Sequence, residues 1–258
     1  GSAVITLTDG SITYKLGDAA HLSTAEKTVN GPMDGQVDAE ARVDAFDGFS
    51  VGLGVGPGTL TVALDMNTDG DLFGDRSVAI ACGGGTTGYG LNFAGDVGAD
   101  LSFTFGTGST APSAAGCLGD NASNAASATT MGLGVAIPMG DISIALDYES
   151  TSWNNTVGTT ETKNAQSGFE ISVTMGGIAD GTAGINISSN ATSQTVGTAD
   201  ATTGSASGTE LWWTVPIGPV SLAVGYGSDS YTTGAGTAAS PTVTALDTQM
   251  GAEMSMSF

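Results

Sequence analysis

The last twelve residues of the chain, Asp247 to Phe258, alternate between apolar and polar side chains, and this alternation restricts the fold most strongly. Counted back from the terminus, the apolar positions are Phe258, Met256, Met254, Ala252 and Met250. Because successive side chains of a strand point to opposite faces, the segment is predicted to form a strand with one apolar and one polar face. It is long enough to cross a bilayer as a tilted strand, which takes about 9–11 residues. An edge strand of a soluble sandwich is the alternative.

Composition favours an all-β protein and excludes some partners. The chain has 258 residues with 41 Gly, five Lys plus Arg and 26 Asp plus Glu, which gives a net charge of -21. A chain with so large an excess of acids cannot neutralise the phosphates of a nucleic acid. Nucleic acid is therefore excluded as a partner. No apolar run approaches the roughly 18 residues of a transmembrane helix, and helix formers are few. Because the chain begins with Gly1, we expect either a mature exported product without its signal peptide or a residue left from cloning.

The same alternation recurs along the chain, and disordered segments do not maintain a period of two. In residues 3–16 it changes phase at Asp9-Gly10, which indicates either a hairpin or a glycine bulge within one strand. Each half of a hairpin would have only about six residues, too few to span a bilayer, so we expect the bulge. The predicted strands are 3–16, 37–46, 49–56, 59–67, 77–82, 87–94, 99–105, 130–137, 142–150, 165–175, 182–188, 209–215, 220–228 and 247–258.

The predicted connections alternate between short and long in the second half of the chain. Short turns at 138–141, 176–181 and 216–219 alternate with long polar loops at 151–163, 189–207 and 229–246. Outer-membrane barrels combine short periplasmic turns with longer extracellular loops. Tight turns are also expected at Asp47-Gly48 and Pro57-Gly58. We therefore predict one domain, residues 1–258, folded as a transmembrane antiparallel up-and-down β-barrel. It would have about 14 strands (12 to 16 remain open), with both termini on the periplasmic side.

The two faces of these strands differ in charge. The apolar face is predicted to meet lipid, where charge is costly. Small residues are frequent on the other face, and a barrel of 12 or more strands with such a face encloses water. Acidic groups lining a pore attract cations, so a cation preference is predicted. The predicted pore-lining set holds nine acids and two bases: Lys15, Asp38, Glu40, Arg42, Asp44, Asp65, Asp147, Glu149, Glu170, Glu210 and Glu253.

Taken together, the alternation, the asymmetry of the connections, the terminal Phe258 and the acidic inward face resemble the porins of Gram-negative outer membranes. The resemblance is architectural and spans the whole chain, which is shorter than the usual 16-stranded members. It implies an assembly signal at Phe258, Met256 and Met254, and a homotrimer in contact with the lipid bilayer and lipopolysaccharide. It also implies passive diffusion of small hydrophilic solutes. An inward-folded loop that narrows the pore is implied too, for which 106–127 and 67–76 are the candidates.

Two further motifs indicate sites of other kinds. The run Asp65, Asn67, Asp69 and Asp71, with Gly70 at the sixth position, matches the start of a calcium-binding loop. Its twelfth position is Arg76 instead of Glu, so an acidic turn is the alternative, and no other cofactor is expected. Cys82 and Cys117 are the only cysteines. An exported protein with an even number of cysteines can form a disulfide, and two free thiols are the alternative.

The sequence offers little support for an enzyme. His21 is the only histidine, and a catalytic histidine needs a partner. Ser23 and Asp18 are close in sequence, but nothing arranges them as a triad, so we expect a solvated loop histidine. The leading functional prediction is a cation-preferring porin. The alternatives are a structural or adhesive exported surface protein without a pore and, third, a barrel enzyme.

Overall fold

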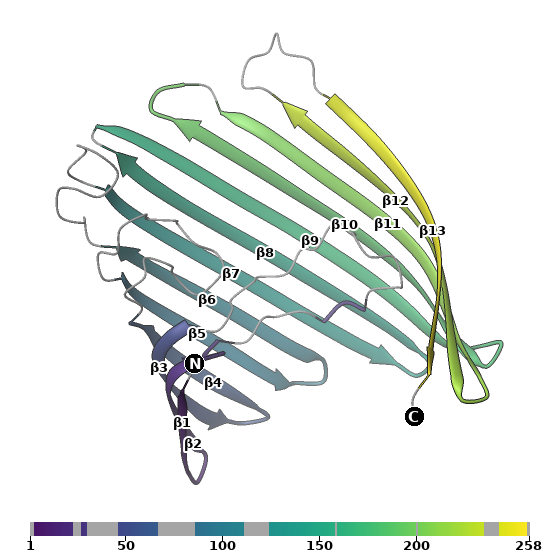
Figure 1. Cartoon of the computed structure of the whole chain (residues 1–258). Coiled ribbons are helices and arrows are strands. Elements are labelled where there is room, and N and C mark those ends of the chain that lie inside the picture. Colours follow the sequence, from purple (N-terminus) through teal and green to yellow (C-terminus); the bar gives the residue numbers. More distant parts are fainter. Residues whose placement is uncertain are drawn as a thin grey trace.

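The fold is a single antiparallel sheet of thirteen described strands, each hydrogen-bonded to its neighbours in sequence. This computed structural model describes residues 3–22, 27–29, 46–66, 86–110, 124–157, 159–199, 201–234 and 243–256. Figure 1 shows that the sheet is long and strongly curved, with the concave side open. The strands are β1 (Val4–Asp9), β2 (Ile12–Ala19), β3 (Phe46–Val55), β4 (Gly58–Asp65), β5 (Thr86–Asp96), β6 (Asp100–Thr110), β7 (Asn124–Met139), β8 (Ile142–Val157), β9 (Thr160–Ile178), β10 (Gly181–Val196), β11 (Thr202–Ile217), β12 (Val220–Gly234) and β13 (Val243–Met256).

Four hairpins close at one end of the sheet with the same two-residue turn, which places glycine first. The turns are Gly10-Ser11, Gly56-Pro57, Gly140-Asp141 and Gly218-Pro219. Their glycines have φ between 57° and 67°, and a type II′ hairpin turn requires positive φ at its first central residue. The β9–β10 turn instead uses Ala179 and Asp180, both with positive φ, as a type I′ turn requires. These five turns close five of the hairpins at this end of the sheet.

The structure corrects three predictions in the first quarter of the chain. Residues 3–16 form a hairpin, with Asp9 paired to Ile12, so the expected bulge is wrong. The expected turn at Asp47-Gly48 is also wrong, because both residues lie within β3. Glycine is needed at position 48 for close packing, since an added Cβ would lie 2.4 Å from the Leu64 carbonyl oxygen. The turn expected at Pro57-Gly58 lies one residue earlier.

The three long loops predicted in the second half are mostly strand. β8 and β9 continue as a hairpin to Val157 and Thr160, and β10 and β11 continue to Val196 and Thr202. β12 likewise extends to Gly234. These extensions carry Thr, Ser and Asn on both faces, so they show no apolar alternation even though β-branched Thr favours strands. β8 and β10 have 16 residues each, more than the roughly 9–11 that cross a bilayer, so the hairpins project beyond it.

One face of the sheet carries an apolar band that ends sharply. On β8 the outward residues Ile142, Ile144, Leu146 and Tyr148 are followed on the same face by Ser150, Ser152 and Asn154. The cross-strand partners of Ile144 are Ile137 and Val173, so the band continues from strand to strand. Val62, Ile144 and Met254 lie on this apolar face and are 49%, 37% and 75% exposed. This exposed apolar belt with a polar rim is typical of a transmembrane barrel.

The sheet is not closed in the part of the chain that the structure describes. β1 and β13 are its edges and are not paired with each other. Thirteen strands lie within the predicted range of 12 to 16, but the count is odd, so β1 begins and β13 finishes at opposite ends of the sheet. The expectation of an even count with both termini at one end is therefore wrong for these strands. Predicted strands 77–82 and most of 37–46 lie outside the described residues. Within the described residues, no helix is long and apolar enough to span a bilayer.

The position of the apolar band predicts how much a charged side chain destabilises the barrel at each site on the outward face. Val224 lies within the band, opposite Trp213 and Ala252. We expect Val224→Arg to lower the free energy of unfolding by about 2–4 kcal/mol if the site is near the bilayer midplane. Ser228→Arg, on the same strand and face but above the band, should cost only about 0–1 kcal/mol. Urea unfolding of the barrel in vesicles measures both, and equal costs would show that the band does not meet lipid.

Candidate functional site

The face opposite the apolar band is polar and buried, and most of the described acids predicted to line a pore lie on it. Asp65, Asp147, Glu149, Glu170 and Glu210 are each at most 3% exposed. Asp147 is directly opposite Glu170 in the β8–β9 pair. Across the next strand pairs, Glu210 is opposite Asn186, whose other neighbour is Ser172. None of these buried acids is without a partner.

The two remaining described members of the predicted set lie near the edges of the sheet. Lys15 lies on β2 opposite Ser50 and is partly exposed. Glu253 lies on the edge strand β13 opposite Ala223 and is exposed. Asp38, Glu40, Arg42 and Asp44 lie outside the described residues. For the whole predicted set, the role of lining a pore remains a prediction.

A short segment from the connection after β2 docks on this polar face, and we call its residues, Lys27–Val29, the strap. The Asp147 carboxylate accepts hydrogen bonds from the backbone N–H of Lys27, at 2.9 and 2.7 Å, and from that of Thr28, at 2.6 Å. It also accepts one from the Thr28 hydroxyl at 2.7 Å. The Val29 N–H donates to Ser172 Oγ at 3.1 Å. Carboxylates bind such donors strongly, so Asp147 fixes the strap to β8.

Two further contacts hold the segment that carries the strap. Lys27 Nζ forms an ion pair with Asp100 at 2.9 Å. Upstream, Leu22 packs with Phe46 and Ala63 in a small apolar cluster on the polar face. Gly90 makes room for it, because an added Cβ at Gly90 would lie 2.3 Å from Leu22 Cδ1. Leu22 therefore lies against β3–β5, and the strap lies against β8 and β9.

Sequence reasoning missed the strap and several buried polar residues. The candidates for an inward-folded loop were 106–127 and 67–76. Of these, 106–110 belongs to β6, 124–127 belongs to β7, and the rest lies outside the described residues. Nothing in the sequence distinguishes residues 27–29 from an ordinary polar loop. Asp229, which is 4% exposed, was assigned to a loop, although it continues the inward alternation of β12.

His21 is also placed differently from its prediction as a solvated loop residue. Its side chain is 4% exposed. Its ring lies 4.9 Å from the Phe46 ring, measured between centroids. Ser23 and Asp18 were the partners considered from sequence, but the structure gives His21 a different hydroxyl partner, Ser50. The burial follows from the contacts of His21 with Ser50 and Phe46 on β3.

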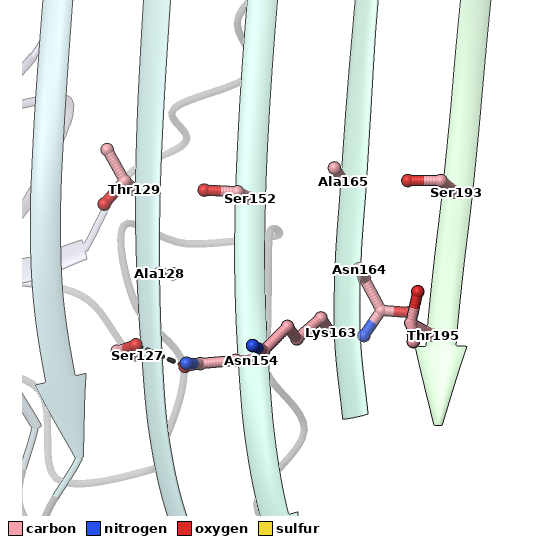
Figure 2. A pocket seen from close by; sticks show the side chains of 10 residues that line it. All are labelled: Ser127, Ala128, Thr129, Ser152, Asn154, Lys163, Asn164, Ala165, Ser193 and Thr195. Atoms are coloured by element: carbon pink, nitrogen blue, oxygen red, sulfur yellow. Dashed lines mark hydrogen bonds between the residues drawn. The ribbon is translucent and has the colours of Figure 1, made fainter. Parts of the chain in front are cut away.

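A depression of about 320 Å³ lies on the polar extension of β7–β10, shown in Figure 2. Most of its lining is neutral, with hydroxyl and amide groups such as Ser152, Asn154 and Ser193. Asn154 is hydrogen-bonded to Ser127 and, at 3.3 Å, to Glu161. Lys163, the one cation in the lining, pairs with Glu161 at 3.2 Å. No predicted pore residue lines this depression.

The predicted calcium, disulfide and assembly residues are mostly outside the described part of the chain. Asp65 is buried at the end of β4, but Asn67, Asp69 and Asp71 are not described, nor are Cys82, Cys117 and Phe258. Met254 and Met256 are 75% and 48% exposed on β13. Among the described residues, no three potential ligands gather into a metal site. Calcium binding and the disulfide therefore stay predictions.

Comparison with known proteins supports the fold. No family model and no curated protein sequence matches the chain. A solved structure of outer-membrane expressed OmpT of Vibrio cholerae aligns with a TM-score of 0.55 at 10% identity, covering 97% of this chain and 79% of that one. The in-vitro folded trimer form of OmpT from the same organism aligns with a TM-score of 0.54 at 9% identity, covering 97% and 77%. The fold is therefore that of outer-membrane β-barrel proteins, in agreement with the predicted outer-membrane location.

Docking of the strap can be tested by proteolysis. Trypsin cleaves after Lys27, whose side chain is 20% exposed and paired with Asp100, while Thr28 is 7% exposed. We expect slow cleavage there in the wild type and much faster cleavage in Asp147→Ala, because that variant removes the acceptor of the strap's donors. Mass spectrometry of the fragment beginning at Thr28 measures the rate. Glu253→Gln is the control and should cleave like the wild type; equal rates in all three would show that Asp147 does not hold the strap.

Proposed function

We propose that the chain is an outer-membrane porin: a passive diffusion channel for small hydrophilic solutes and ions, with a preference for cations. The observation that carries this proposal is the opposite character of the two faces. The convex face carries the exposed apolar band, and the concave face carries buried acids and small polar residues. A spanning sheet with lipid on one side and water on the other needs this distribution.

Glycines on the concave face support an open interior. Gly134 is opposite Asp147, and Gly168 is opposite Glu149. Gly208 lies between Ser188 and Asp229 in the next strands. An acid beside a glycine can lie against the wall in the space that a side chain would otherwise fill, and these acids are buried. A barrel wall built in this way leaves room for water and solute.

Charge on the same face supports a cation preference. The concave side carries four further buried acids, Glu149, Glu170, Glu210 and Asp229. Among the described strand residues on that side, the basic residue is Lys15. The charge of Asp147 is compensated locally by the strap's donors. One sign of charge on low-dielectric walls concentrates counter-ions, so the remaining acids would set the selectivity.

The strap supports the narrowing that the porin resemblance implies. It lies on the concave face and is fixed from both sides, by Asp100 and by Asp147 with Ser172. We propose that it narrows the channel, in place of the loops expected from sequence.

Two partners belong to the same proposal. The apolar band is suited to the lipid bilayer and to neighbouring subunits, and one of the two similar structures is described as a trimer form. We propose a homotrimer for this chain too. The polar extensions above the band would lie among the lipopolysaccharide head groups.

One observation favours a second candidate, a structural or adhesive surface protein without a pore. The β8–β9 and β10–β11 hairpins project well beyond the apolar band and carry polar residues on their outer face. An exported surface protein could present such hairpins to a partner. This candidate needs no conduction, so electrical recording separates it from the porin.

Ion selectivity tests the proposal directly. The reversal potential across a KCl gradient in planar bilayers should show cation preference, and the double variant Glu170→Gln/Glu210→Gln should weaken it. Raising the salt should weaken it as well, because the Debye length falls from about 10 Å at 0.1 M to about 3 Å at 1 M. Glu161→Gln, on the outer face beside Lys163, should leave it unchanged. Anion preference would contradict the charge assignment, and absence of conduction would favour the surface-protein candidate.

The role of the strap is tested by single-channel conductance. Asp147→Ala should increase the conductance, because the strap loses its carboxylate anchor. A cross-link between Val29→Cys and Ser172→Cys, in a Cys82→Ser/Cys117→Ser background, should restore the lower conductance until it is reduced. Unchanged conductance in Asp147→Ala, in a preparation that trypsin shows to have released the strap, would mean that the strap does not narrow the channel.

A further inference from the structure

Ser50 and His21 form a buried pair on the concave face, away from the strap. His21 Nδ1 lies 2.9 Å from Ser50 Oγ, and His21 Nε2 lies 2.7 Å from the Gly17 carbonyl oxygen. Ser50 is 2% exposed and His21 is 4% exposed. The three residues come from β2, the segment after it and β3, so the β2–β3 pairing brings them together.

The hydrogen bonds fix which ring nitrogen carries the proton. A carbonyl oxygen can only accept, so Nε2 must donate to Gly17 and carry the hydrogen. In the neutral ring Nδ1 is then unprotonated, and the Ser50 hydroxyl donates to it. The imidazole is thus oriented by a backbone acceptor and has its basic nitrogen on a serine. A serine beside a base that is itself oriented by a third group is the arrangement of an activated nucleophile.

The pair opens on a cavity of about 200 Å³. Lys15, Thr13, Gly52 and Thr61 share its lining with Ser50 and His21. Lys15 supplies positive charge beside the cavity, where its Nζ donates to the Ala20 carbonyl oxygen at 3.4 Å, and the threonine hydroxyls supply donors. Such groups can stabilise an oxyanion. A cavity of this size admits only a small acyl group.

The fold itself does not require this pairing. Ser102 and Ser188 occupy the same polar face and are 2% and 3% exposed. The Oγ atoms of both have no hydrogen-bond partner in the described part of the chain. The fold therefore tolerates a buried serine on this face without a histidine partner. Ser50 differs because His21, from a separate segment, is hydrogen-bonded to it.

We propose that Ser50 is a catalytic nucleophile, with His21 as its general base, and that the cavity hydrolyses small carboxylic esters. Ser50 Oγ bonds to the ester carbonyl carbon while its proton passes to His21 Nδ1, and the carbonyl oxygen becomes an oxyanion. When the oxyanion collapses, the bond to the alcohol oxygen breaks and that oxygen takes the proton from His21. Water then attacks the acyl-serine by the same path. The net reaction consumes ester and water, releases acid and alcohol, and restores Ser50.

The test uses the full-length barrel in detergent micelles, so it does not depend on channel function. A small fluorophosphonate should label the folded wild type at Ser50, located by peptide mass, and p-nitrophenyl acetate should be hydrolysed. Ser50→Ala should lose both signals. His21→Gln fills similar space without a base, and should lower both rates by about 10²–10⁴-fold. Ser102→Ala is the matched control, an equally buried serine without a histidine, and should behave like the wild type.

A second series of variants distinguishes loss of folding from loss of the serine's reactivity. Heat-modifiable migration on gels shows which variants form the barrel. If His21→Gln does not fold, Ser50→Cys in a Cys82→Ser/Cys117→Ser background replaces it. Iodoacetamide should then alkylate Cys at position 50 at least tenfold faster than Ser102→Cys in the same background. Absence of label at Ser50 in folded wild type, or equal alkylation of the two thiols, would overturn the proposal and leave the pair a packing contact.

Discussion

The whole structure depends on satisfying backbone hydrogen bonds within the sheet. A bilayer supplies no partners for N–H and C=O groups, so a spanning strand must find them on its neighbours. Pairing of each strand with its neighbours in sequence does this along the sheet from β1 to β13, and four of the hairpins close with the same Gly-first turn. Once the strands pair in register, the side-chain period of two separates the chain into an apolar outer face and a polar inner face. The band and the acidic wall are therefore two results of one constraint.

The inner face has its own organisation, which the carboxylates dominate. Asp147 accepts hydrogen bonds from two consecutive backbone N–H groups and a hydroxyl of the strap. A carboxylate buried on a wall needs such donors, because an unpaired buried charge is very costly. The strap thus satisfies Asp147, and Asp147 holds the strap. The other buried inward acids, Asp65, Glu149, Glu170, Glu210 and Asp229, also have partners.

Sequence reasoning found the strands where one face was apolar and lost them where both faces were polar. The segments around Ile144, Val173 and Val224 were predicted as strands and are strands. Residues 151–157 and 189–196 were predicted as loops, because Thr, Ser and Asn on both faces leave no hydrophobic period to read. The Asp9-Gly10 phase change was ambiguous for a different reason. A bulge and a two-residue turn both use a glycine there, and only pairing with a partner strand distinguishes them.

By itself, the sequence determined the fold class, the direction of the apolar face and the inward phase of Asp147, Glu149, Glu170 and Glu210. These follow from local periodicity, which needs no knowledge of distant contacts. The tertiary structure alone decided which segment crosses the inner face and which residues meet there. Thr28 contacts Asp147 across 119 positions of sequence, and His21 contacts Ser50 across 29. No local pattern encodes such pairs, because each depends on where a loop of polar residues comes to rest on a completed sheet.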